Sequence, residues 1–96
     1  MADPGVLEQE ATETRTQLAP PWNVVCWNDP ITYMIYVTMV FQRVFGYSYE
    51  KAYGLMMEVH TSGRAVVWTG AREKAETYVQ KLHASQLKAT MESTGE

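Results

Sequence analysis

The stretch Trp22–Val37, WNVVCWNDPITYMIYV, decides the fold because it changes from strand to helix around a polar corner. Its first six residues are rich in aromatic and β-branched side chains, which favours a buried strand. The corner NDP at 28–30 ends that strand, since proline donates no hydrogen bond to a ladder and restricts the residue before it. Thr32 is the predicted N-cap of a helix that runs to about Phe45. The corner is either a solvated turn or the polar end of a pocket.

Apolar residues recur at spacings of three and four in three segments, which predicts three amphipathic helices over 32–45, 49–60 and 71–83. Ser48 is the predicted cap of the second helix, and Gly46 is a natural end for the first. RAVVWT at 64–69 and QLKATM at 86–91 are typical of strands. The order is β-α-α-β-α-β, which predicts an α+β fold in which a small three-stranded sheet packs against three helices.

Length and composition fit one domain with a modest core. Three parts are predicted: a flexible N-terminal extension over 1–21, a core domain over 22–92 and a C-terminal tail over 93–96. Cys26 is the single cysteine, so no intrachain disulfide forms, which suits a reducing cytoplasm. The N-terminus lacks the pattern of a secretory signal, and no apolar run approaches the roughly 20 residues that span a bilayer.

The net charge of −3 is unevenly distributed. Residues 1–21 hold four acidic side chains and one basic side chain, so residues 22–96 are neutral overall. Without a basic stripe, nucleic acid is not an expected partner. Neither a membrane nor a metal or other cofactor is expected.

Three polar residues occupy positions where the chain otherwise favours apolar ones: Asn28, Asp29 and His60. If the first two helices pack antiparallel, Met34, Val37, Met56 and Val59 line one cleft, with the three polar residues at its mouth. The residues alone leave a second interpretation open. A helix-end histidine on an apolar face is usually a satisfied core residue, and Asn-Asp before a helix is usually turn chemistry.

Three segments together resemble a known family: WNDP-x-T-x-M-x-x-V at 27–37, LMMEVHTSGRAVV at 55–67 and LKATME at 87–92. They are similar to ClpS, the adaptor that hands N-degron substrates to a Clp AAA+ unfoldase and protease. The WNDP form is similar to that of actinobacterial members, and the resemblance covers about residues 22–92.

The resemblance implies a binding site for a free N-terminal Leu, Phe, Tyr or Trp. Asn28, Asp29 and His60 match the groups that hold the substrate's α-amine, although Pro30 replaces a second aspartate. The implied hydrophobic pocket comprises Thr32, Met34, Val37, Met56, Val59 and Leu87. Met34 matches a methionine that excludes β-branched side chains.

The resemblance also implies a partner, the N-terminal domain of a ClpC- or ClpA-like unfoldase. The family docks partly through its third helix, where Glu73 matches a docking glutamate and Tyr78 replaces the usual lysine. The N-terminal extension is implied to be needed for substrate delivery. Such an adaptor is not an enzyme and has no catalytic residue.

Two other functions stay open. A hydrolase would use Cys26, or a serine, with His60 and Asp29, although the cysteine lies within a strand and no activated nucleophile is recognisable. A generic interaction module would instead bind a peptide or helix in the methionine-lined groove without N-terminal specificity.

Overall fold

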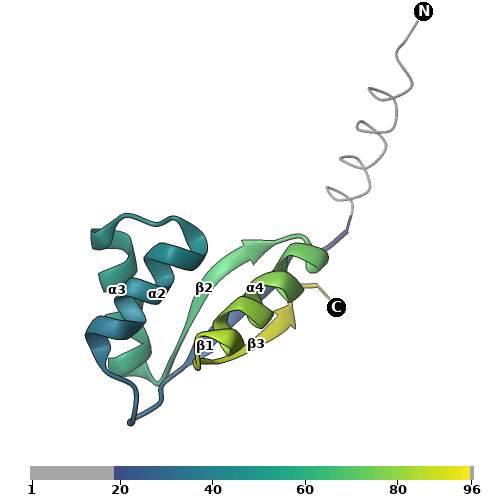
Figure 1. Ribbon diagram of the computed structural model, residues 1–96. Helices are drawn as coiled ribbons and strands as arrows, with labels where there is room; N and C mark the ends of the chain where they lie inside the picture. The colour runs from purple at the N-terminus through teal and green to yellow at the C-terminus, as the bar shows by residue number, and fades with distance from the viewer. Residues whose placement is uncertain (1–18, 96) are drawn as a thin grey trace, which may run out of the picture.

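The computed structural model describes residues 19–95, which form three strands and three helices (Figure 1). In chain order these are β1 (Trp22–Trp27), α2 (Met34–Phe45), α3 (Tyr49–Ser62), β2 (Arg64–Gly70), α4 (Arg72–Ala84) and β3 (Lys88–Ser93). The predicted α+β fold and its order are confirmed. Predictions that fall on residues 1–18 and 96 lie outside the described residues, so the division into extension, core and tail stays a prediction.

The sheet is antiparallel throughout, with β1 at its centre and the strand order β2-β1-β3. Trp27, the last residue of β1, pairs with Arg64 on one side and Lys88 on the other. The start of β2 and the start of β3 therefore lie beside the polar corner that follows β1. A β-bulge between Val24 and Val25 shifts the register against β2.

The helices enclose a continuous core on one face of the sheet. Figure 1 shows α4 covering the sheet, with its axis roughly along the strands, while α2 and α3 lie side by side at one end of the sheet. Phe41 and Val40 of α2, Leu82 of α4 and Val24 of β1 are fully buried in this core. The Tyr47 hydroxyl donates to the Val67 carbonyl at 2.7 Å, which fixes the α2–α3 connection to β2.

The predicted N-cap of α2 is wrong. The helix begins at Met34 with Tyr33 as its N-cap, and no side chain caps it. Thr32 instead belongs to a β-turn, because its N–H donates to the Asp29 carbonyl at 3.1 Å.

The other helix ends follow from capping and glycine. Ser48 caps α3 as predicted, accepting from the Lys51 N–H at 3.2 Å. The helix runs two residues beyond the predicted end, to Ser62, because Gly63 adopts the left-handed conformation (φ 88°) that terminates it.

The last strand lies two residues later than predicted. Gln86 has a φ of 69°, and the Leu87 N–H donates to the Leu82 carbonyl at 3.0 Å, so both residues belong to the turn after α4. Ser93, predicted in the tail, is the last residue of β3. Thr94 donates from its N–H and hydroxyl to the Pro21 carbonyl, at 3.0 and 2.7 Å. Within 19–95, no helix is both long enough and apolar enough to cross a membrane.

Candidate functional site

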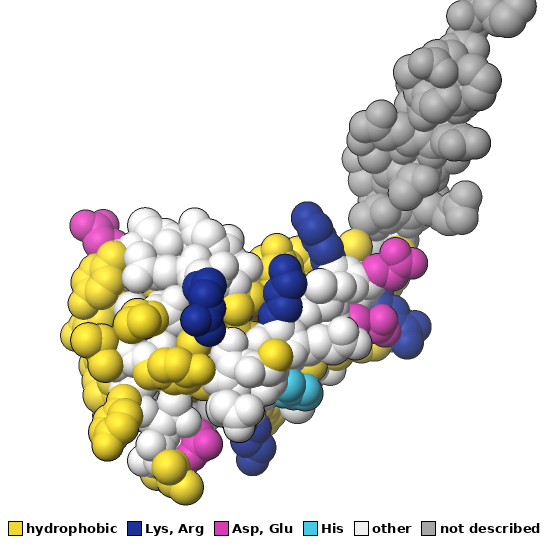
Figure 2. All heavy atoms as spheres, in the orientation of Figure 1, with side chains coloured by type: hydrophobic (Ala, Val, Ile, Leu, Met, Phe, Trp, Pro, Cys, Tyr) yellow, Lys and Arg dark blue, Asp and Glu magenta, His cyan; other side chains and the backbone are white. Residues whose placement is uncertain are grey.

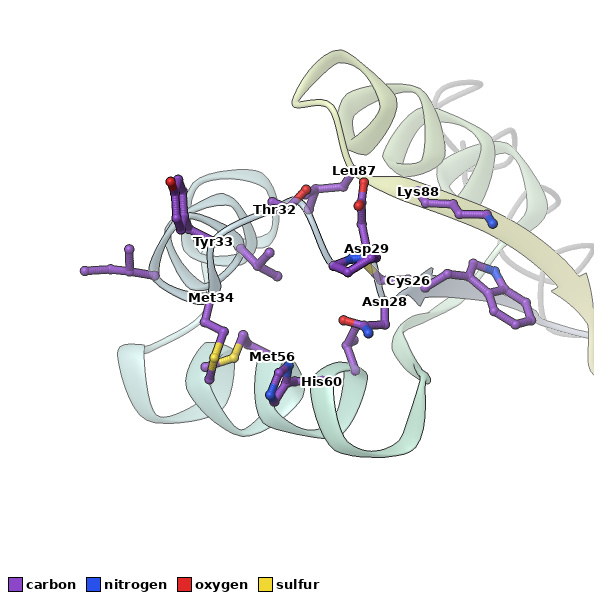
Figure 3. Close-up of a pocket in the computed structure, with 15 residues that line it drawn as sticks. Cys26, Asn28, Asp29, Thr32, Tyr33, Met34, Met56, His60, Leu87 and Lys88 are labelled. Atoms are coloured by element: carbon purple, nitrogen blue, oxygen red, sulfur yellow. The ribbon is translucent and has the colours of Figure 1, made fainter.

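A pocket of about 450 Å³ opens where α2, α3 and the residues flanking β1 and β3 meet (Figure 3). This volume falls in the range of small-molecule and side-chain binding sites. All nine residues predicted for amine binding and for the hydrophobic pocket line it: Asn28, Asp29, Thr32, Met34, Val37, Met56, Val59, His60 and Leu87. Residues up to 59 positions apart in the chain are thus gathered around one cavity.

The wall of the pocket consists of core side chains. Met56, Val59 and Leu87 are at most 5 % exposed and belong to the hydrophobic core cluster. Met56 and Val59 lie three residues apart on α3, so they share its inward face. Met34 lies at the opening and is 38 % exposed, and Figure 3 shows it beside Met56.

Two polar side chains lie together at the rim. The Asn28 N–H donates to the Gly63 carbonyl at 2.9 Å, which ties the end of β1 to the end of α3. His60 lies three residues before Gly63, so the same contact brings it next to Asn28. In Figure 3 the Asn28 amide and the His60 ring face the same opening, and both side chains are exposed.

The Asp29 side chain, in contrast, is bonded within its own turn. Its Oδ1 accepts from the Ile31 N–H at 2.9 Å, and its carbonyl accepts from the Thr32 N–H. Pro30 takes the second position of this turn, where its fixed φ is favoured. Figure 3 shows the Asp29 carboxylate turned toward Leu87 and Lys88, away from Asn28 and His60. The carboxylate therefore serves as a turn acceptor while placing one negative charge at the rim.

Cys26 also lines the pocket, but its thiol is not a reactive group. The side chain is 2 % exposed, and burial raises the pKa of its thiol to about 11. The thiol therefore stays protonated at neutral pH and packs as a small apolar group. Within residues 19–95, no cluster of His, Cys, Asp and Glu side chains could hold a metal ion.

Comparison with known proteins identifies the family. A family model described as ATP-dependent Clp protease adaptor protein ClpS matches residues 17–92. The chain belongs to the ClpS family. An ATP-dependent Clp protease adapter protein ClpS from Mycobacterium marinum is 50 % identical over 91 residues, which cover 95 % of this chain and 90 % of the relative. The one from Corynebacterium diphtheriae is 47 % identical over 95 residues, covering 99 % and 84 %. Both organisms are actinobacteria, as the WNDP form predicted.

A solved structure agrees with the ClpS fold. The structure of Agrobacterium tumefaciens ClpS2 bound to L-phenylalaninamide superposes with a TM-score of 0.74 at 30 % identity, covering 78 % of this chain and 98 % of that one. The family name describes an adaptor of the Clp protease rather than an enzyme.

The predicted docking residue of this ClpS chain lies away from the pocket. Glu73 is exposed in the first turn of α4. Tyr78, which replaces the expected lysine, packs its ring against Phe45 and Trp68, with centroids 4.8 and 4.9 Å apart. Tyr78 is therefore partly a core residue, and its ring–ring contacts are ones that a lysine at this position could not form.

Several lining residues are not among those predicted from the sequence: Trp27, Tyr33, Ile35 and Lys88. Each directly precedes or follows a predicted site residue in the chain. At the end of a strand or the start of a helix, neighbouring side chains can both reach the mouth of a pocket. Their position next to predicted site residues is the sequence signal that could have identified them.

Proposed function

We propose that this ClpS chain binds the free N-terminal residue of N-degron substrates, with Leu, Phe, Tyr or Trp preferred, and delivers them to a Clp unfoldase for degradation. The observation that carries the proposal is a single pocket whose wall is apolar and whose rim holds both an amide and an imidazole that face its opening. An N-terminal residue presents an ammonium group and a side chain on the same carbon, so such a pocket accommodates both.

Each rim group suits an ammonium. Asn28 offers a carbonyl oxygen, and neutral His60 offers a nitrogen lone pair. Charge-assisted hydrogen bonds of this kind contribute about 1.5–3 kcal/mol each. Asp29, whose carboxylate is engaged by the Ile31 N–H, adds attraction through its charge rather than as a third acceptor in the same place.

The wall suits a large unbranched or aromatic side chain. Burying a Leu or Phe side chain contributes roughly 1.5–3 kcal/mol. Met34 stands at the opening beside Met56 and would exclude side chains branched at Cβ. The ligand of the Agrobacterium relative supports this assignment, because phenylalaninamide combines a free α-amine with an aromatic side chain.

For delivery, we propose docking on the N-terminal domain of a ClpC- or ClpA-like unfoldase through the α4 surface that carries Glu73. This surface lies apart from the pocket, so substrate and unfoldase can be bound together. The buried, protonated Cys26 thiol supports an adaptor over a thiol hydrolase.

A peptide panel tests the binding proposal. Fluorescence anisotropy would compare peptides that differ only at residue one, each with an N-acetylated counterpart. Free Leu, Phe, Tyr and Trp should bind at about micromolar Kd, and acetylation should weaken binding by at least about 100-fold, because it removes the charge and leaves rim acceptors unpaired. Equal binding of all first residues would instead indicate a generic peptide-binding groove.

A further inference from the structure

An exposed apolar strip runs from the mouth of the pocket along α2. We call its four residues the mouth strip: Ile31, Tyr33, Ile35 and Met39, which are 86, 81, 74 and 55 % exposed. Large contiguous apolar patches on a folded surface commonly mark interaction sites. Figure 2 shows hydrophobic side chains gathered over the part of the surface formed by α2 and α3.

The strip is continuous with the pocket. Tyr33 and Ile35 themselves line it, on either side of Met34 in the chain. Ile35 and Met39 lie four residues apart on α2, so they share one face about 6 Å apart along the axis. Three residues of extended peptide span about 10 Å, enough to cover this distance.

The strip is also free of charge. No Asp, Glu, Lys, Arg or His occurs between Pro30 and Gln42. The charged side chains at the pocket lie elsewhere around its mouth, at Asp29 and Lys88. The chemistry of the strip therefore selects apolar or aromatic side chains.

We propose that the mouth strip binds residues two to four of the substrate and favours apolar side chains there. This inference rests on the proposed function, because a chain whose first residue fills the pocket must leave by its mouth. The continuity of strip and pocket favours the substrate as occupant over a second copy of this chain or the unfoldase. The substrate class is then an N-terminal Leu, Phe, Tyr or Trp followed by a short apolar segment, rather than any chain that begins with one of these residues.

The test uses two peptides that both begin with Phe and carry no charge at residues two to four, Leu-Tyr-Leu in one and Ser-Gly-Ser in the other. Anisotropy titrations of the full chain should show about tenfold tighter binding of the first, equivalent to about 1.4 kcal/mol. The variant Tyr33→Ser/Ile35→Ser should reduce this ratio to within about twofold, because the apolar contacts are lost.

The matched control is Tyr49→Ser/Tyr53→Ser. These two residues are also exposed, at 60 and 45 %, but they lie on α3 and do not line the pocket. The control should keep the tenfold ratio. Circular dichroism checks that each variant is folded. The comparison of the two peptides on the unmodified chain tests the inference even if a variant fails to fold.

Three outcomes would overturn the inference. Equal affinity of the two peptides for the unmodified chain would remove the inference directly. A ratio unchanged by Tyr33→Ser/Ile35→Ser removes the strip as its cause. If that variant alters only self-association, seen by size-exclusion chromatography, or only unfoldase binding, another occupant uses the strip. The residue-one panel, run with Ser-Gly-Ser at residues two to four, tests the proposed function separately.

Discussion

The wall and the rim of the pocket are built in opposite ways. The wall residues Met56, Val59 and Leu87 are buried and belong to the core. The rim residues Asn28 and His60 are exposed, and a backbone hydrogen bond from the Asn28 N–H to the Gly63 carbonyl ties the two segments that carry them. Folding therefore requires the wall, whereas the rim side chains remain free for a ligand. Substitutions in the two regions should separate stability from binding.

The largest effect is expected in the wall. Met56→Ala removes a side chain that is 3 % exposed, and such core truncations cost about 2–5 kcal/mol of unfolding free energy. For a domain of this size, the lower figure alone lowers Tm by roughly 8–16 °C. Urea denaturation followed by circular dichroism measures the change. An unchanged midpoint would show that the wall is not part of the stabilising core.

A smaller effect, confined to binding, is expected at the rim. His60→Ala should weaken binding of a Phe-initiated peptide by about 1.5–3 kcal/mol, because a charge-assisted hydrogen bond is lost. The free energy of unfolding should change by no more than about 0.5 kcal/mol, as is usual at exposed positions. Anisotropy and urea denaturation on the same variant measure both quantities.

His83→Ala is the matched control for His60. The His83 ring contacts the Ala89 carbonyl at 2.7 Å and joins α4 to β3, and it does not line the pocket. Its loss should lower stability by about 0.5–1.5 kcal/mol and leave peptide binding intact. A His60→Ala variant that loses stability but retains binding would reverse the assignment and place His60 in the core.

The same contrast explains what the sequence could predict. The regular spacing of apolar residues predicts the helices and the wall, because residues buried on one face of α3, such as Met56 and Val59, recur three or four positions apart in the sequence. The residues of the turn at the rim show no such regular spacing. Thr32 was predicted as a cap because Ser and Thr favour that position. Whether the 29–32 segment forms a β-turn instead depends on Pro30 and on the Asp29 side chain, and several residue combinations fit either structure.

The exposed lining residues were the least predictable. Along α2 the period of apolar residues places Val37 and Phe41 on the inward face and leaves Ile35 on the outward face, so the exposure of Ile35 is predictable. The period does not indicate that Ile35, or Tyr33 just before the helix, reaches the mouth of the pocket, because this depends on how α2 packs against its neighbours. The orientation of the Asp29 carboxylate likewise follows from a local bond to the Ile31 N–H, which residue type alone does not specify.

The smallest effect concerns the charge of the rim. Pro30→Asp would place a second carboxylate beside Asp29, at an exposed position. Its attraction for the substrate ammonium should be worth at most about 1 kcal/mol, because solvent screens exposed charges. Losing proline should at the same time cost about 0.4–1 kcal/mol of stability, since the unfolded chain gains freedom. Peptide affinity should therefore rise by no more than about fivefold at low salt, and the gain should vanish near 1 M salt, where the Debye length is about 3 Å.

Pro30→Asn separates the two contributions, because asparagine has the shape of aspartate without its charge. It should lose the same stability as Pro30→Asp, within about 0.5 kcal/mol, and show no salt-dependent gain in affinity. If both variants bind the peptide equally at every salt concentration, a second carboxylate at the rim adds nothing to amine binding. The amine would then be held by the rim groups already present, and the proline would serve only to hold the 29–32 turn.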